Sequence, residues 1–284
     1  MNAEEYALSH GLTKVGARPP LAEYVRTAIK RINFAYTLAS FGNEATNATS
    51  RLGGWWNLLL PTIQASTYGL IFGLIMGSSR PDNFLPFLFT GVFLFSFFQG
   101  SFTAGASSIV SRSGLVKSLS FPRVLLPLSV VISQTITLIP QLFVLAVMLI
   151  GIQGIGSISI SWLMMIPLIS LMFLFNFGCA MIMARITVHV RDLNKLVPFI
   201  NRIMFYVSGV FFSAAKIFEM HSVWAKLITL NPVFDFLNLA RGYLVVGYHV
   251  SPAEWIPVII WSFAVAAFGF VFFWRAEERY GRED

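Results

Sequence analysis

The side chains that most often carry out chemistry are scattered in this chain and form no recognisable site. The single cysteine, Cys179, lies within an apolar run, so neither a disulfide framework nor a thiol metal site is expected. The glycine-rich loop that binds nucleotide phosphates and ends in Gly-Lys-Ser or Gly-Lys-Thr is absent. The histidines lack the close spacing of zinc ligands: His10, His189, His221 and His249. We therefore expect no catalytic residue, metal or cofactor on this chain.

Charged groups are also nearly absent from the long apolar runs. Only Glu254, at the edge of the last run, and Arg202 carry charge there. Ion-coupled transporters place carboxylates near the membrane midplane, where these groups bind and release the coupling ion. The chain offers no such site, so the energy for uphill transport would have to come from a partner.

The composition predicts an all-α polytopic membrane protein. Of 284 residues, 56% are hydrophobic and 12% charged, whereas soluble domains are roughly half apolar and a quarter charged. A helix needs about 20 mostly apolar residues to cross the hydrocarbon layer. Six apolar runs predict a transmembrane domain over residues 55–274 with these spanning helices: 55–76, 84–110, 124–150, 162–184, 197–214 and 254–274.

Basic residues fall mostly on one side of these predicted spans. Fifteen of the 20 Lys and Arg residues lie in residues 1–54, the tail 275–284 and the connections after the second and fourth spans, against four on the opposite side. The positive-inside rule then places both termini in the cytoplasm. This distribution accounts for the net charge of +7 without nucleic-acid binding.

A short basic segment, residues 111–122, lies between the second and third spans and reads SRSGLVKSLSFP. The charge distribution places this amphipathic segment on the cytoplasmic side. It could receive force from a partner, or it could be a basic loop that only fixes the topology.

The N-terminal segment contains an amphipathic helix at about residues 21–36. Its apolar residues recur at steps of three and four, and Arg26, Lys30 and Arg31 fall off that face. Such a helix suits the membrane interface, although a helix packed on a soluble domain would show the same pattern. The apolar face comprises Leu21, Val25, Ala28, Ile32 and Tyr36.

Residues 215–251 differ from the other apolar stretches because their apolar pieces are too short to span the membrane. Asn231 and Pro232 divide these pieces, and Asp235 follows. Asn at an N-cap, Pro at the first helical position and an acid in the first turn predict a helix start. Two re-entrant half-helices facing outward would fit, as would two amphipathic helices lying flat on the outer surface.

Taken in order, these motifs resemble the permeases of ATP-binding-cassette (ABC) polysaccharide exporters, which export O-antigen, teichoic acid or cell-wall galactan on lipid carriers. The similarity covers nearly the whole chain and depends on motif order rather than on any single motif. The residues that carry it are Lys117, Phe121-Pro122-Arg123, Leu126-Pro127, Arg191-Asp192-Leu193, Asn231-Pro232 and Arg241-Gly242.

The resemblance implies a homodimeric permease that carries two copies of a separate ATPase subunit, with ATP and Mg²⁺ on that partner. Its substrate would be a lipid-linked polysaccharide, and the protein would lie in the inner membrane of a bacterium. Residues 111–122 would be the coupling helix that contacts the ATPase. The implied coupling residues are Arg112, Leu115, Lys117, Leu119, Phe121, Pro122 and Arg123.

Two further groups of residues follow from this interpretation. Sugar rings stack on aromatic faces, so the aromatic second helix and its neighbour offer a glycan path lined by Tyr68, Phe93, Phe97 and Phe98. These rings could equally be core or lipid-facing residues. The half-helices would form an outer gate, with candidate residues Asn231, Pro232, Phe234, Asp235 and Arg241.

Two other functions fit parts of the sequence. A permease of the same family could export drugs or lipids instead of glycan, and a neighbouring ATPase gene among glycosyltransferase genes would favour the glycan exporter. An integral membrane enzyme of glycan assembly would need interfacial carboxylates or a metal site. For such an enzyme, the chain has only the isolated Asp82, Asp192 and Asp235.

Overall fold

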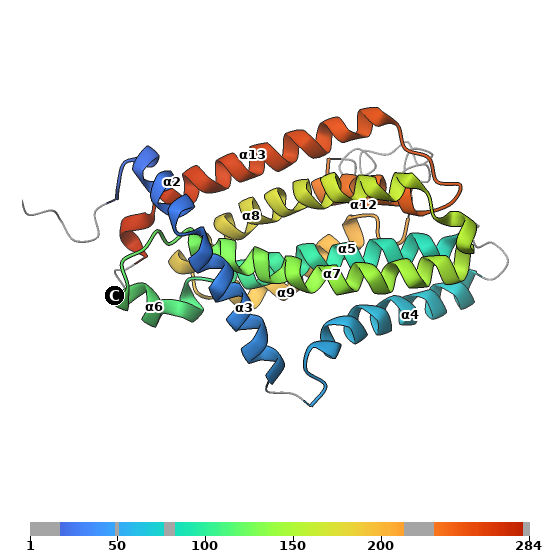
Figure 1. Cartoon of the computed structure of the whole chain (residues 1–284), viewed down its shortest axis with the longest axis horizontal. Coiled ribbons are helices and arrows are strands. Elements are labelled where there is room, and N and C mark those ends of the chain that lie inside the picture. The colour runs from blue at the N-terminus through green and yellow to red at the C-terminus, as the bar shows by residue number, and fades with distance from the viewer. Residues whose placement is uncertain (1–17, 49–50, 77–82, 213–229, 281–284) are drawn as a thin grey trace, which may run out of the picture.

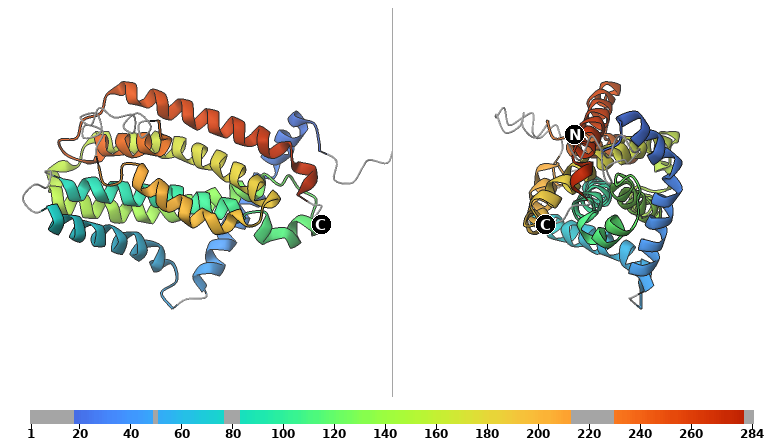
Figure 2. Two further views of the ribbon diagram at one scale, coloured as in Figure 1. Left: turned by 180° about the vertical axis from the view of Figure 1, so that it is seen from behind. Right: turned by 90° about the vertical axis from the view of Figure 1, so that its left-hand side faces the viewer.

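The structure is a computed structural model that describes residues 18–48, 51–76, 83–212 and 230–280, and every regular element within these ranges is helical. The prediction of an all-α fold is therefore confirmed. Most of the long helices run side by side along the longest axis of the molecule (Figures 1 and 2). The bundle helices are α4 (Trp56–Met76), α5 (Phe84–Ser107), α7 (Leu125–Gln153), α8 (Met165–His189), α9 (Leu193–Val207), α12 (Pro232–Leu244) and α13 (Trp255–Trp274).

Four helical segments in the described residues are long and apolar enough to cross a membrane. They are Phe84–Ser107, Leu125–Gln153, Ile160–His189 and Pro252–Trp274, and they match the predicted second, third, fourth and sixth spans. Helix α4 lies where the first span is predicted but falls outside this set, as does α9. The protein is thus a multi-pass membrane protein, and the count of six spans stays a prediction.

The predicted fifth span, 197–214, differs from the helix found there. Helix α9 begins earlier, at Leu193, and ends at Val207, so it has only 15 residues. Gly209 follows with φ of 70°, a left-handed conformation that commonly ends helices at glycine. Residues 213 and 214 lie outside the described part of the chain. Most of the first predicted half-helix, which precedes Asn231, lies outside it too.

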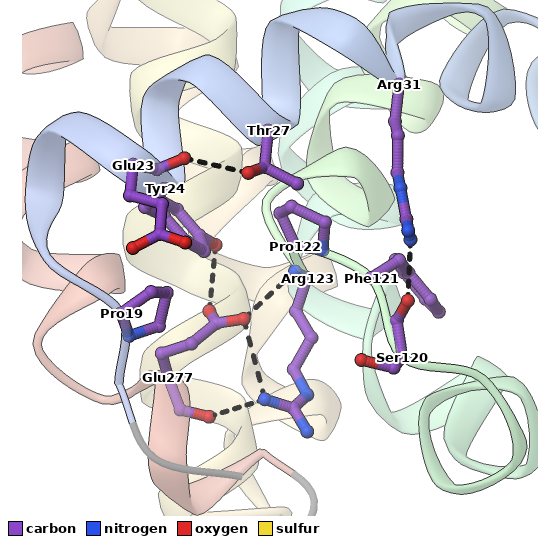
Figure 3. Close-up of a pocket in the computed structure, with 10 residues that line it drawn as sticks. All are labelled: Pro19, Glu23, Tyr24, Thr27, Arg31, Ser120, Phe121, Pro122, Arg123 and Glu277. Carbon is purple, nitrogen blue, oxygen red and sulfur yellow. Dashed lines mark hydrogen bonds and ion pairs between the residues drawn. The ribbon is translucent and has the colours of Figure 1, made fainter. Parts of the chain in front are cut away.

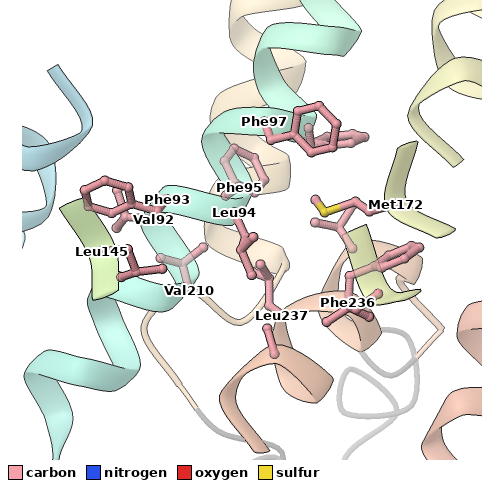
Figure 4. Close-up of a cluster of buried hydrophobic side chains, with 14 of the residues drawn as sticks. Val92, Phe93, Leu94, Phe95, Phe97, Leu145, Met172, Val210, Phe236 and Leu237 are labelled. Carbon is pink, nitrogen blue, oxygen red and sulfur yellow. The ribbon is translucent and has the colours of Figure 1, made fainter. Parts of the chain in front are cut away.

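Helix α5 forms the centre of the bundle, and its phenylalanines fill the core. Seen from the end, it is enclosed by its neighbours (Figure 2, right). Phe93, Phe95 and Phe97 lie in one buried cluster with residues from several other helices, among them Met172 of α8 and Phe236 of α12 (Figure 4). The aromatic run in the sequence therefore supplies the main apolar core of one chain.

Several segments that are distant in the sequence meet at one end of the bundle, which we call the basic end. The N-terminal helix α2 (Leu21–Lys30) lies there beside the C-terminal end of α13 and near the short helix α6 (Ser113–Ser118) (Figure 1). The α8–α9 connection, with its basic residues, lies there too. The connections predicted to be cytoplasmic thus share one end of the molecule.

The predicted interface helix, 21–36, is two helices in the structure. Helix α2 ends at Lys30, and α3 (Ile32–Ala48) continues beyond Arg31 across the side of α7. The Arg31 guanidinium donates a hydrogen bond of 2.6 Å to the carbonyl of Ser120. Tyr24, Ala35 and Ala39 are the buried residues of α2 and α3, whereas much of the predicted apolar face points away from the protein: Leu21, Ile32 and Tyr36.

Helices α8 and α13 approach so closely that their backbones touch at two glycines. A Cβ atom on Gly269 would lie 2.5 Å from the carbonyl oxygen of Gly178, and one on Gly178 would lie 2.5 Å from that of Val265. Neither backbone carbonyl can move aside without shifting its helix. The contact holds α13 in place and so positions its C-terminal end at the basic end.

We expect Gly269→Ala to destabilise the protein by about 1–3 kcal/mol, because the added methyl group overpacks this contact. Thermal unfolding in detergent would measure the change. Gly151→Ala is the matched control, since nothing lies within 4 Å of a Cβ atom at this helical position. Equal unfolding temperatures for the two variants would contradict the role given to the α8–α13 contact.

Candidate functional site

The 111–122 segment forms a short helical turn followed by an extended return to the bundle. A 3-10 turn at Val110–Arg112 leads into α6, and the chain leaves that helix at Leu119 in an extended conformation. Val116 is buried, whereas Lys117 and Leu119 are exposed, with Leu119 exposing 51% of its surface. Leu119 is therefore available to a partner without any change in the segment.

The other predicted coupling residues hold the segment on the bundle. Arg112 donates a hydrogen bond of 3.0 Å to the hydroxyl of Ser129 on α7. The Phe121 ring lies 5.0 Å from the ring of Phe34 on α3, centroid to centroid. Leu115 and Phe121 are half-buried against a second apolar cluster, and Pro122 is buried. Their side chains thus fix the position of α6 relative to α3 and α7.

Arg123 belongs to a buried polar cluster at the basic end, drawn in Figure 3. Its guanidinium lies 3.5 Å from a carboxylate oxygen of Glu277, and its main-chain N–H donates to the same oxygen at 3.1 Å. The Tyr24 hydroxyl donates to the other carboxylate oxygen at 2.8 Å. Beside this cluster, a cavity of about 280 Å³ separates α2 from the extended return. One carboxylate therefore joins three segments of the chain.

A second set of contacts fastens the N-terminal segment to the end of α13. The Arg18 guanidinium lies 4.3 Å above the ring of Trp274, whose indole N–H donates to the carbonyl of Pro19 at 3.1 Å. The main-chain N–H of Arg18 donates to Glu278 at 3.1 Å. Helix α2 and the end of α13 are thus joined at several points.

At the opposite end, α12 begins where the sequence predicts a helix start. The Asn231 side chain accepts a hydrogen bond from the N–H of Val233 at 3.1 Å, and Pro232 is the first helical residue. The Asn231 amide also donates to the hydroxyl of Ser208, just after α9, at 2.9 Å. Asp235 lies in the first turn, and its buried Oδ2 has no hydrogen-bond partner among the described residues. The start of α12 is therefore tied to the end of α9.

Arg241 makes a second connection between α12 and the end of α9, through a larger number of hydrogen bonds. Its side chain is completely buried, and it donates to the carbonyls of Phe87, Gly209 and Val210 at 3.1, 2.8 and 3.1 Å. The guanidinium also lies 3.5 Å from the centre of the Phe87 ring. Carbonyl groups after a helix C-terminus carry partial negative charge, which favours a cation there. Arg241 therefore joins α12 to α5 and to the end of α9.

The remaining gate residue, Phe234, is buried and packs against Gly209. Of the candidate path residues, Phe93, Phe97 and Phe98 are buried in the core around α5. Tyr68 is half-buried on α4. Because it is only half-buried, Tyr68 is the candidate nearest to the protein surface. Its ring lies 5.4 Å from that of Phe205 on α9, centroid to centroid.

Among the described residues, no three or more His, Cys, Asp or Glu side chains gather in one place. The sequence interpretation missed Tyr24 and Glu277. Both lie in segments rich in charged and polar residues, and 253 positions separate them. Only a pattern that links the two ends of the chain could have revealed their contact.

Comparison with known proteins shows a match to the family of ABC-2 type transporters over residues 43–245. The chain is also similar to three proteins named O-antigen export system permease protein RfbA. One from Klebsiella pneumoniae is 32% identical over 70% of this chain and 75% of its own length. A second from the same organism is 29% identical over 82% and 87%. The third, from Myxococcus xanthus, is 29% identical over 80% and 83%.

We expect Arg241→Met to lower the stability strongly, because each buried carbonyl left without a donor costs about 1–3 kcal/mol. Thermal unfolding in detergent would detect the loss. Arg241→Lys should recover part of it, since the ammonium group keeps the charge but lacks the planar fork of the guanidinium. Arg275→Met is the matched control, because Arg275 is exposed just after α13. A wild-type unfolding temperature for Arg241→Met would contradict this assignment.

Proposed function

The chain belongs to the ABC-2 type transporter family, and on that premise we propose that it is the permease subunit of an ABC exporter of lipid-linked polysaccharide. The observation that carries this proposal is the similarity to O-antigen export permeases over 70% to 82% of the chain. Its role is transport through the membrane rather than catalysis.

The energy would come from a separate ATPase subunit, present in two copies, that binds ATP and Mg²⁺. The absence of a phosphate-binding loop in this sequence supports that division of labour. Helix α6 is a suitable docking element, because it projects from the basic end and exposes Leu119 beside Lys117. The ATPase would then act on α6 while Arg112 and Phe121 hold the segment on the bundle.

A second copy of the chain would complete the transporter. Helices α4 and α9 lie beside each other, and their outer surfaces carry exposed apolar side chains and the charge of Arg202. Lipid does not satisfy an arginine, whereas a second copy or a water-filled passage does. Exposed apolar residues on these helices include Leu60, Ile63, Leu70 and Leu74 of α4 and Phe199 and Ile203 of α9.

The polysaccharide path is best placed along this α4–α9 side. Phe93, Phe97 and Phe98 would reach a sugar only if α5 separated from its neighbours, because they are packed in the core. Tyr68 lies at the α4–α9 contact and needs no such change. Helix α12, held by Arg241, would form the outer gate of the path.

The proposed location is the bacterial inner membrane, with the basic end in the cytoplasm. Both described chain ends, Arg18 and Tyr280, lie at that end with the basic connections. The positive-inside rule supports this orientation.

Deletion of the gene should abolish surface polysaccharide and cause lipid-linked polysaccharide to accumulate inside the cell. Surface labelling and analysis of lipid extracts would measure the two pools, and the wild-type gene on a plasmid should restore both. Unchanged surface polysaccharide, together with a lost resistance to a drug, would instead support the drug exporter.

The docking role of α6 predicts that Leu119→Asp lowers recovery of the ATPase with the tagged permease by about tenfold, since a charge replaces an interfacial apolar side chain. Co-purification and surface polysaccharide would be measured together. Ile155→Asp is the control, because Ile155 exposes 79% of its surface at the opposite end. Normal recovery and export with Leu119→Asp would rule out α6 as the docking element.

A further inference from the structure

Glu277 lies in a short 3-10 turn just after α13, where its side chain is 4% exposed. All its close polar partners are donors. They are the Tyr24 hydroxyl at 2.8 Å, the N–H of Arg123 at 3.1 Å and the Arg123 guanidinium, which also donates to the main-chain carbonyl of Glu277 at 2.9 Å (Figure 3). A carboxylate is the side chain that accepts all of these bonds without offering a competing donor.

Burial raises the pKa of Glu277 above its ordinary value, and the hydrogen bonds from Arg123 and Tyr24 and the charge of Arg123 limit that rise. Burial also raises the pKa of Tyr24 well above its ordinary value, so the hydroxyl keeps its proton and can donate. The same hydroxyl accepts from the N–H of Val124 at 3.1 Å.

These contacts hold the connection that links α6 to α7. Arg123 and Val124 lie between the extended return from α6 and the first residue of α7, Leu125. Glu277 and Tyr24 bind the two consecutive main-chain N–H groups of this connection. A displacement of α6 that follows the chain into α7 therefore passes through residues held by α2 and by the end of α13.

We propose that Glu277 is a positioning residue for energy coupling, which joins the return from α6 to α2 and α13 so that the three move together. The inference rests on the proposed function, because it assumes that an ATPase acts on α6. Glu277 touches no substrate and acts through Arg123 and Tyr24. The contact between α8 and α13 at Gly178 and Gly269 would carry the displacement further into the bundle.

The test compares Glu277→Gln with Glu44→Gln in the full complex of permease and ATPase, reconstituted in vesicles that contain the lipid-linked polysaccharide. Glu44 is an exposed glutamate of α3 outside this cluster, so its replacement is the matched control. Complex recovery, ATP hydrolysis and polysaccharide transported per ATP would be measured. We expect Glu277→Gln to keep the first two within about twofold and to lower transport per ATP about tenfold, the factor expected for loss of one hydrogen bond to a charged group.

Tyr24→Phe provides a second arm. It should also lower transport per ATP, and combining it with Glu277→Gln should add little, because the effects of residues that act through one contact are not additive.

A wild-type ratio of transport to ATP hydrolysis for Glu277→Gln would overturn the inference. Parallel loss of complex recovery, hydrolysis and transport would also overturn it, since that pattern indicates a structural role only. Failure of the wild-type chain to recover an ATPase or to transport would instead overturn the proposed function, and this inference with it.

Discussion

A bilayer offers no water to backbone polar groups, so chain that leaves helical geometry near the membrane must find its partners within the protein. Two irregular stretches in this structure meet that requirement through a few side chains. At the end of α9, buried carbonyls that lack helical partners accept hydrogen bonds from Arg241. At the start of α7, N–H groups are bound by Glu277 and Tyr24. A cation serves carbonyls at one end of the bundle, and an anion with a hydroxyl serves N–H groups at the other.

Features with a local cause could be predicted from the sequence. The start of α12 depends on Asn231 and Pro232 alone, and the cap forms as expected. The basic connections gather at one end because alternating spans return the chain to the same side. The joint formed by Tyr24 and Glu277 could not be predicted, since no short-range pattern pairs these residues. Arg241 could be chosen as a gate residue, but its carbonyl partners depend on where α9 ends.

The aromatic run in α5 shows that composition cannot tell a sugar-binding surface from an apolar core. Phenylalanine is suited both to stacking on sugars and to filling a core, because its ring has no polar group to satisfy. The position of α5 among α4, α7, α8 and α12 decides in favour of the core within one chain. The N-terminal helix shows the same limit. Its buried side includes Tyr24 rather than the expected apolar face, because the fit to the basic end outweighs periodicity.

The contact between Tyr24 and Glu277 also sets an order on biosynthesis. Tyr24 leaves the ribosome long before Glu277, which follows 253 residues later. Chains grow from the N-terminus, so α2 can make this contact only after every segment up to α13 has been synthesised. A chain cut short directly after α13 would keep its helical spans and lack this connection. The basic end is thus assembled only after the spans that lie between its two partners.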